Sequence, residues 1–506
     1  MVEVLDEYKI MASGVPAEVR IMRREDKFTD TYELKQIKLQ PATELVLDQI
    51  KRKIIENVEV DAAAISDVKG LQNARESFIK RTEEQVKEEL GDVNEATKKI
   101  LVGKLVHELV GLGEMELLLA DENLEEVVVN SAAEPVRVYH KKWGWLETNL
   151  YLESEAQARN YASIISRWVG RQITTLNPLL DARLNSGDRA NATLAPISSK
   201  GISITIRKFA KNPWTIIKQL DPKIKTVSLE VAALVWLCMQ YELNALVSGG
   251  TASGKTSILN AMLIFTPPNQ RVISIEDTRE LFMPDFLHWT PLLTRPPNPE
   301  GKGEITMLDL VVNSLRMRPD RIVVGEIRRA MEAEVLFEAM HTGHAVYATV
   351  HADSAEQVRR RLINPPIELP ESVLGALHLI VVQYRDRRSG RRRTFEVAEV
   401  IPNEDGTVKV NVIYRWNPAT DVLEKISEPV RLLTQLKMYA GMDEKMMQAD
   451  LKEKQMILQY MLDRKITETD DIGRIVANYY RNREKVLEIV KRKGNPEELY
   501  RMKTGG

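Results

Sequence analysis

The spacing of hydrophobic residues in the first part of the chain is that of amphipathic helices. From Pro41 to about Leu119, apolar residues recur every three or four positions, which places them on one face of a helix. The residues before Pro41 are polar and show no clear period. Together these observations predict a helical N-terminal region over residues 1–95.

The pattern then changes to short runs of apolar and β-branched residues that end at turn residues. Such strand-like runs occupy residues 126–130, 136–140 and 201–207. A segment with helical spacing lies between them, at about residues 153–171. Strands and helix together predict a compact α+β domain over residues 96–212.

A proline and the loss of any period after Lys211 predict a linker over residues 213–222. Beyond it, wholly apolar runs alternate with helical segments, and the clearest runs are Asn244–Ser248, Arg271–Ile275, Arg321–Gly325 and Ala345–Val350. This alternation is typical of a mainly parallel sheet covered by helices. We therefore expect an α/β domain over residues 223–426 and a charged, helical C-terminal region over residues 427–506.

Composition narrows the functional classes. The 506 residues are enough for several domains, and the 43% hydrophobic and 28% charged residues are typical of a globular protein. The formal net charge of -2 gives no chain-wide positive field for nucleic acid or anionic membrane. Cys238 is the only cysteine, which excludes an intrachain disulfide and a thiolate zinc site. Without a signal-peptide pattern or a membrane-spanning apolar run, the chain is expected to be cytoplasmic.

A phosphate-binding motif stands between an expected strand and an expected helix. The residues GGTASGKT at Gly249–Thr256 fit the pattern GxxxxGK[ST], for which an ordinary glycine turn is the alternative interpretation. Glycines let successive N–H groups curl around a phosphate, Lys255 can reach the β- and γ-phosphates, and the Thr256 hydroxyl can bind Mg²⁺. The motif therefore predicts that ATP and Mg²⁺ bind to Gly249, Gly250, Thr251, Ala252, Ser253, Gly254, Lys255, Thr256 and Ser257.

Hydrolysis also needs a group that orients or activates water, and two glutamates follow apolar runs. Glu326 follows Arg321–Gly325, and the carboxyl edge of parallel strands is where ligands collect in open α/β sheets. We predict that Glu326 is catalytic and supports Mg²⁺, with a helix-capping acid as the alternative. Glu276 follows Arg271–Ile275 in the same way, and either a second wall of the site or a capping acid fits its position.

His344 and His351 flank the apolar run Ala345–Val350. Their odd spacing places them on opposite faces of a strand, although both lie near loops. No third ligand stands at a suitable spacing for a metal. From the residues alone, a structural and a functional role remain equal alternatives for each histidine.

These motifs, in this order, resemble the secretion ATPase superfamily, which includes type II secretion, type IV pilus, type IV secretion and archaellum motors. The resemblance covers about residues 100–400. Its motifs are a Walker A sequence at Gly249–Thr256, an Asp box at Arg271–Glu280, a Walker B region at Leu315–Arg328 and a His box at Thr342–Ala352. It implies a RecA-like P-loop ATPase domain preceded by a PAS-like α+β domain.

The resemblance also implies roles for single residues. Glu326 corresponds to the catalytic glutamate, and Glu276 to a carboxylate near the γ-phosphate and the attacking water. His344 and His351 correspond to sensors of the nucleotide state. A single cysteine excludes the four-cysteine zinc module of bacterial type II members.

Three arginines of the α+β domain match segments that approach nucleotide across a subunit boundary in this superfamily: Arg183, Arg189 and Arg207. Which of them does so stays open, with a surface ion pair as the alternative for each. Arg318 and Arg329 stand where acidic residues are usual, which favours an archaeal-type branch.

The implied assembly is a homo-hexamer, peripheral at the inner face of the cell membrane. It would act on a polytopic membrane platform protein and a pilin-like secretion apparatus. One alternative is a RecA-like nucleic-acid-translocating ATPase, supported by six arginines in Arg385–Arg393, although no aromatic residue interleaves with them. Another is a nucleotide-gated assembly protein that is active only with its partner.

Overall fold

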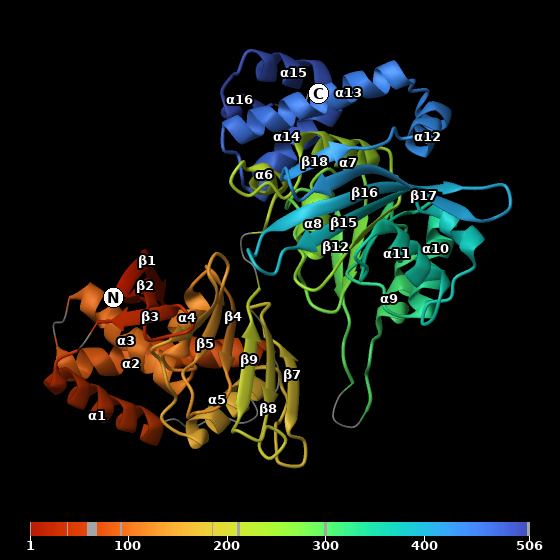
Figure 1. Ribbon diagram of the computed structural model, residues 1–506. Coiled ribbons are helices and arrows are strands. Elements are labelled where there is room, and N and C mark those ends of the chain that lie inside the picture. The colour runs from red at the N-terminus through yellow and green to blue at the C-terminus, as the bar shows by residue number, and fades with distance from the viewer. Residues whose placement is uncertain are drawn as a thin grey trace. The chain divides into compact units, whose positions relative to one another are not determined.

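The computed structural model describes residues 2–37, 39–57, 68–91, 94–184, 186–209, 213–297 and 301–502 (Figure 1). The chain forms two compact units, Met1–Lys211 and Asn212–Gly506. Each unit has its own clusters of buried hydrophobic residues. The boundary between the units falls next to the linker that the sequence predicts.

The first unit is built on a nine-stranded sheet with the order β1-β2-β3-β6-β5-β4-β9-β8-β7. Its strands are β1 (Val2–Ala12), β2 (Val15–Arg24), β3 (Thr31–Gln36), β4 (Leu124–Val129), β5 (Arg137–His140), β6 (Gly144–Thr148), β7 (Leu179–Arg183), β8 (Arg189–Thr193) and β9 (Ser203–Arg207). Its helices are α1 (Pro41–Asn57), α2 (Val68–Leu90), α3 (Glu95–Leu109), α4 (Met115–Ala120) and α5 (Glu155–Trp168).

The first three strands contradict the prediction that residues 1–95 are helical throughout. In β2 every second side chain is buried, namely Val15, Ala17, Val19 and Ile21. A period of two indicates a half-buried strand. This alternation is present in the sequence, but it covers only four apolar positions and the prediction missed it. Among the described residues of this region, α1, α2 and the first residue of α3 follow the helical prediction, while residues 1, 38, 58–67 and 92–93 lie outside the described residues.

The second unit is built on another nine-stranded sheet, with the order β12-β11-β13-β14-β10-β15-β16-β17-β18. The strands from β12 to β15 in this order pair in parallel, and the last three are antiparallel. The predicted α/β class with a mainly parallel sheet is thereby confirmed. The strands are β10 (Ala245–Gly249), β11 (Val272–Glu276), β12 (Trp289–Leu293), β13 (Arg321–Val324), β14 (Ala345–Val350), β15 (Leu379–Arg385), β16 (Arg392–Pro402), β17 (Val408–Asn417) and β18 (Val422–Lys425).

Helices lie against both faces of this sheet (Figure 1). They are α6 (Ile216–Leu220), α7 (Leu229–Gln240), α8 (Lys255–Leu263), α9 (Met307–Ser314), α10 (Ala330–His341), α11 (Ala355–Ile363), α12 (Arg431–Ala440), α13 (Glu444–Asp463), α14 (Thr469–Arg481), α15 (Arg483–Lys491) and α16 (Pro496–Tyr500), with a 3₁₀ turn at Glu371–Ala376. In the described part of the chain, no helix has the length and apolarity needed to cross a bilayer.

Adjacent side chains of β13 point to opposite faces of the sheet and pack in different hydrophobic clusters. Val323 of β13 packs in the cluster that contains α7 and α8, whereas Ile322 and Val324 pack in the cluster that contains α9, α10 and α11. Because both faces are covered, these strands are apolar throughout, which explains why their runs stand out in the sequence.

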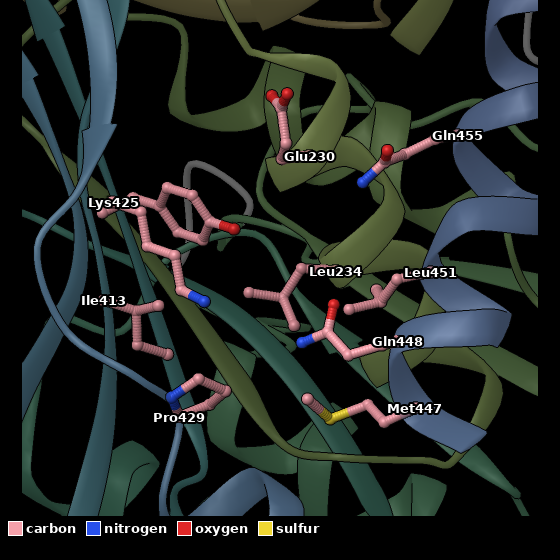
Figure 2. A pocket seen from close by; sticks show the side chains of 10 residues that line it. Glu230, Leu234, Ile413, Lys425, Pro429, Met447, Gln448, Leu451 and Gln455 are labelled. Atoms are coloured by element: carbon pink, nitrogen blue, oxygen red, sulfur yellow. The ribbon is translucent and has the colours of Figure 1, made fainter. Parts of the chain in front are cut away.

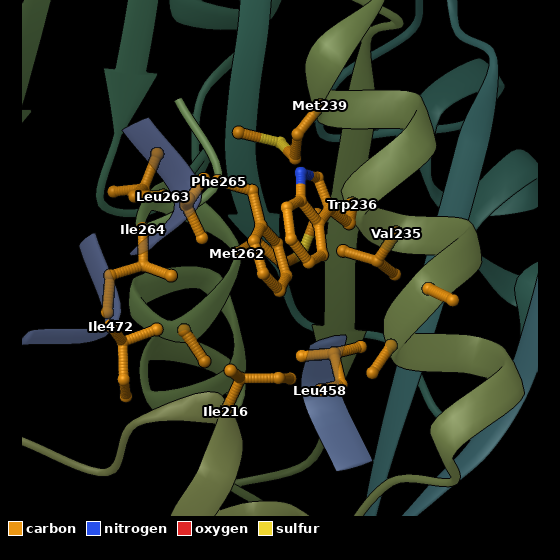
Figure 3. Packing of buried hydrophobic residues seen from close by; sticks show 14 of the residues in the cluster. Ile216, Val235, Trp236, Met239, Met262, Leu263, Ile264, Phe265, Leu458 and Ile472 are labelled. Carbon is orange, nitrogen blue, oxygen red and sulfur yellow. The ribbon is translucent and has the colours of Figure 1, made fainter. Parts of the chain in front are cut away.

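Aromatic contacts join the C-terminal helices to this core. Trp236 of α7 stacks on Phe265, with ring centroids 4.9 Å apart and planes 6° from parallel (Figure 3). Trp236 Nε1 donates to Tyr480 Oη at 2.9 Å, and Tyr480 Oη donates to the Phe265 carbonyl at 2.6 Å. Cys238, also on α7, is buried, and burial raises the pKa of its thiol to about 12.

A buried ion pair lies in the same interface. The side chain of Lys454 on α13 is fully buried, and its Nζ contacts Asp450 one turn earlier. This Nζ lies 5.6 Å from the ring centre of Trp236 and 5.2 Å from that of Tyr479. Tyr479 Oη donates to the second Asp450 oxygen at 3.2 Å. Burial lowers the pKa of Lys454, and the Asp450 carboxylate opposes that shift.

We predict that Asp450→Ala destabilises the second unit by about 3–5 kcal/mol, because it leaves the Lys454 ammonium buried without its anion. Replacing both residues, with Asp450→Leu and Lys454→Met, should cost much less, since no buried charge remains. Thermal unfolding of the full chain measures both effects, with exposed Asp463→Ala at the end of α13 as the control. Equal stability of wild type and Asp450→Ala would refute the argument.

Candidate functional site

The phosphate-binding sequence forms a strand–loop–helix turn in the second unit. β10 ends at Gly249 and α8 begins at Lys255. Gly249 and Gly254 have φ values of 146° and 94°, which residues with side chains rarely adopt. A Cβ atom at Gly249 would lie 2.2 Å from the Gln383 carbonyl oxygen of β15. The backbone conformation at both positions therefore favours glycine over residues with a side chain.

Lys255 makes its present contacts with the loop itself. Its Nζ donates to the carbonyl oxygens of Gly249 at 2.9 Å and Gly250 at 3.0 Å, and it lies 3.2 Å from Nδ1 of His351. Burial lowers the pKa of Lys255, and the carboxylate of Glu326 opposes this shift. A phosphate would give the ammonium a charged partner in place of two neutral carbonyl groups.

Parallel pairing brings the ends of several strands to this loop. Val324 of β13 lies opposite Ala348 of β14 and Ile275 of β11, and Thr349 of β14 lies opposite Val247 of β10. The carboxyl ends of these strands therefore share one edge of the sheet. The residues at or just beyond that edge are Gly249, Glu276, Glu326 and His351.

A continuous series of contacts runs from Lys255 to Glu326 and beyond. Besides its contact with Lys255, His351 places Nε2 2.9 Å from Oε1 of Glu326. Arg328 donates to Oε2 of Glu326 at 3.0 and 2.7 Å, and to Asp277 at 2.7 Å. Both oxygens of Glu326 thus have partners. Burial and the charge of Lys255 lower the pKa of His351. The carboxylate of Glu326 opposes this shift.

The sequence did not single out Arg328 and Asp277 as site residues. Asp277 directly follows Glu276, and Arg328 lies two positions after Glu326, so both stand just past the ends of apolar strands. The sequence does show two residues of opposite charge just after two strands. Asp277 and Arg328 come into contact, however, only because β11 pairs with β13. The helix-capping alternative for Glu326 does not hold, because Glu332 caps α10.

Glu276 is the most buried acidic group at this edge, with 2% of its surface exposed. Its Oε1 accepts from the backbone N–H groups of Glu280 at 2.8 Å and Leu281 at 3.1 Å, which are the turn-capping bonds of the alternative interpretation. Its Oε2 has no hydrogen-bond partner in the described part of the chain. Burial raises the pKa of Glu276 to about 7. An orphaned buried oxygen fits a site that takes a further polar group.

His344 lies apart from these residues. It precedes the first residue of β14, whereas His351 follows the last, so the strand separates them by about 20 Å. Nδ1 of His344 lies 3.3 Å from the Ala339 carbonyl oxygen and 3.3 Å from Thr342 Oγ1. Within this unit the fold brings only one of the two predicted histidines to the loop, because they flank opposite ends of one strand.

The three predicted arginines lie together in the first unit. Arg183 of β7 is directly opposite Arg189 of β8, which is directly opposite Arg207 of β9. Directly opposite side chains share a face of the sheet, so the three positions form a row. Asp181 accepts from Arg189 at 2.9 and 2.6 Å, which lowers the pKa of Asp181. Glu126 of β4 lies directly opposite Arg207, so carboxylates stand beside the arginines of this row.

A separate pocket of about 200 Å³ lies between α7, β17, β18 and α13 (Figure 2). Its lining consists of Glu230, Leu234, Ile413, Tyr414, Lys425, Pro429, Met447, Gln448, Leu451 and Gln455. None of the phosphate-site residues lines this pocket.

Comparison with known proteins agrees with the motifs. The profile of the family described as Type II/IV secretion system protein matches residues 121–417. An uncharacterized protein of Methanocaldococcus jannaschii is 36% identical over 323 residues, which are 63% of this chain and 57% of that protein. The type IV secretion system protein PtlH of Bordetella pertussis is 28% identical over 311 residues, which are 55% of this chain and 91% of PtlH.

Among solved structures, the VirB11 ATPase from the Brucella suis type IV secretion system, in complex with sulphate, is 25% identical. The match has a TM-score of 0.28 and covers 55% of this chain and 90% of that chain. This chain spans little more than half the length of the M. jannaschii relative. The family profile covers more than half of this chain and includes the P-loop and both glutamates, so the resemblance is confirmed and the chain belongs to the Type II/IV secretion system protein family.

Proposed function

We propose that this chain is an ATP-hydrolysing motor of a type II secretion, type IV pilus or archaellum machine. The observation that carries the proposal is the contact series from Lys255 through His351 to Glu326. It links a phosphate-binding lysine to a carboxylate suited to activating water. Membership of the secretion family supports the same assignment.

In this proposal the loop Gly249–Thr256 holds the phosphates of ATP. Lys255 exchanges two carbonyl oxygens for phosphate oxygens, and an anion stabilises the charged form that burial disfavours. The Thr256 hydroxyl in the first turn of α8, together with Glu326, fits Mg²⁺, a cation that prefers oxygen ligands. When bound, the cation would neutralise charge on the phosphates.

Activation of water would depend on how Glu326 is held. Each of its oxygens now has a partner that stabilises the charged form, so the carboxylate would become more basic when one partner leaves. Arg328 makes a two-point contact and is also held by Asp277, whereas His351 makes a single contact. We infer that phosphate draws Lys255 away from His351 and that the His351 contact with Glu326 is released first. Loop occupancy would thus free the catalytic carboxylate.

We propose further that six copies form a ring and that one of Arg183, Arg189 and Arg207 reaches the nucleotide of the neighbouring subunit. The row that these arginines form on one sheet face supports this role. Residues 216–220 of the predicted linker form α6 and pack in the core of the second unit, so we place the hinge between the units ahead of α6. The movement would act on a polytopic membrane platform protein and its pilin-like apparatus, with the motor cytoplasmic and peripheral at the inner face of the membrane.

The structure weakens the main support for a nucleic-acid motor. Arg393, in the hairpin between β15 and β16, is buried and makes a two-point ion pair with Asp421, at 2.7 and 3.0 Å. Fewer arginines are then available for a phosphate backbone. A nucleotide-gated assembly protein would use the same site and would differ in needing its partner for turnover.

We predict that Glu326→Gln lowers the rate of phosphate release by about 10²–10⁴-fold, the usual contribution of a general base, while ATP still binds. Lys255→Ala should lose ATP binding, because the loop loses its ammonium group. Phosphate release and titration with a fluorescent ATP analogue measure the two effects. Glu334→Gln on the exposed side of α10 is the matched control. Near-normal release by Glu326→Gln would remove that residue from the mechanism.

The pKa of Glu276 predicts a pH dependence of stability. Burial raises this pKa from 4.5 in the unfolded chain to about 7. A raised pKa contributes stability that is fully present below about pH 4.5 and is lost as the pH rises through about 7, in total up to about 3 kcal/mol. Between about pH 5 and pH 8, the melting temperature of nucleotide-free wild type should therefore fall more than that of Glu276→Gln.

Thermal unfolding at a series of pH values measures the Glu276 effect. The control is again Glu334→Gln, whose exposed carboxylate should leave the wild-type pH dependence unchanged. The same slope in wild type and Glu276→Gln would contradict the assigned pKa.

The ring proposal predicts that ATPase activity depends on protein concentration. Phosphate release per subunit should rise as hexamers form, because each site is completed by an arginine of its neighbour. Activity and mass measured on the same dilution series, with Lys255→Ala as the inactive control, test this. A rate per subunit that is the same for monomer and hexamer would leave the phosphate site intact and rule out the arginines acting across the boundary.

A further inference from the structure

The hairpin formed by β15 and β16 lies directly beside the phosphate loop. Gly249, the last residue of β10, pairs in parallel with Gln383 of β15. β15 then turns back into β16, with Arg385 opposite Arg392. The Gln383 side chain donates to Thr394 of β16 at 2.9 Å, which ties the two strands together at this point. The start of β16 is thereby placed at the loop.

Arg392 lies against the loop. Its Nε donates to the carbonyl oxygen of Ala252 at 3.1 Å. Its Cδ lies 3.5 Å from the position that a Cβ atom of Gly254 would occupy. Ala252 has a φ of 58°, so the carbonyl belongs to the tightly curled part of the loop. The guanidinium is thus held beside the phosphate cradle by a neutral group.

The neighbouring arginines differ from Arg392 in their partners. Arg393 is buried and makes a two-point ion pair with Asp421, at 2.7 and 3.0 Å. Arg391 donates to Ser389 at 3.0 Å and lies 4.0 Å from Asp421. Arg392 has no carboxylate within ion-pair distance among the described residues, and its only polar partner there is the Ala252 carbonyl. Its charge is therefore not neutralised within the described part of the chain.

We propose that Arg392 binds the phosphate chain of the nucleotide held by the same subunit. This inference rests on the proposed nucleotide site and adds to it a second cation from a different segment. Lys255 would meet the phosphates from α8, and Arg392 from the hairpin. A guanidinium has five donors in a planar fork, so one can remain on the Ala252 carbonyl while others reach phosphate oxygens. Because its side chain contacts the Ala252 carbonyl and lies beside Gly254, Arg392 would approach the phosphates from the flank of the loop.

Because Arg392 approaches from the flank, its contact should already exist with ADP. The probe is therefore Mg²⁺–ADP with a fluorescent ribose label, titrated into the full-length chain, which avoids turnover. Arg392→Ala should weaken binding by about ten- to a hundredfold, the range of a charged hydrogen bond. Arg392→Lys should retain most of the affinity, because it keeps the charge. Arg388→Ala removes the same charge from the exposed turn of the same hairpin and should bind like wild type.

A second variant separates phosphate binding from simple support of the loop. Arg392→Gln keeps an N–H donor for the Ala252 carbonyl but loses the charge. Phosphate binding predicts that Arg392→Gln behaves like Arg392→Ala, with the melting temperature of the nucleotide-free protein unchanged. Wild-type affinity of Arg392→Gln, or a lowered melting temperature in every Arg392 variant, would overturn the proposal in favour of a bracing role.

The same titration distinguishes failure of this inference from failure of the proposed function. If wild type binds ADP, Lys255→Ala does not and Arg392→Ala binds like wild type, only the role of Arg392 is wrong. If Lys255→Ala binds ADP as well as wild type does, the phosphate site itself is wrong, and the role of Arg392 falls with it.

Discussion

The common direction of β10, β11, β13 and β14 is the constraint on which the site depends. Because these strands are parallel, four segments far apart in the sequence deliver the phosphate loop, Glu276, Glu326 and His351 to one edge of the sheet. His344 does not reach this edge, because it stands at the opposite end of β14. Parallel strands must be covered on both faces, which is why α7 is buried along nearly its whole length.

Charged groups at this edge are linked by direct contacts before any phosphate binds. Two cations, Lys255 and Arg328, stand with two carboxylates, Glu326 and Asp277, and His351 lies between the Lys255 ammonium and Glu326. In the proposed function, a polyanion that enters the loop would attract Lys255, the member of this series that belongs to the loop itself. The state of the Glu326 carboxylate would then depend on the occupancy of the loop.

Much of the site could be predicted because its signals are local in the sequence. The phosphate loop is one contiguous motif. Glu276 is the last residue of the largely apolar strand β11, and Glu326 stands two residues after the largely apolar strand β13. The strands β1 to β3 were not predicted, because a half-buried strand with a polar outer face lacks such a run. Arg392 could not be predicted either, since its contact with Ala252 joins residues 140 positions apart through the pairing of β10, β15 and β16.

The same hairpin also contacts the segment that follows the boundary between the units. Arg393 donates to the Ile224 carbonyl at 2.8 Å, and the backbone N–H of Thr394 donates to the Thr226 carbonyl at 2.7 Å. Three consecutive residues of β16 therefore contact the phosphate loop on one side and the turn after α6, at Ile224 and Thr226, on the other. In the proposed role of Arg392, a phosphate that moves its guanidinium would act on a strand whose next residues contact residues 224 and 226. A second contact reaches α6 directly from the helix of the phosphate loop, because Gln219 Nε2 donates to the Ser257 carbonyl at 3.1 Å. The segment after the boundary is therefore tied to the phosphate loop both through β16 and through α8.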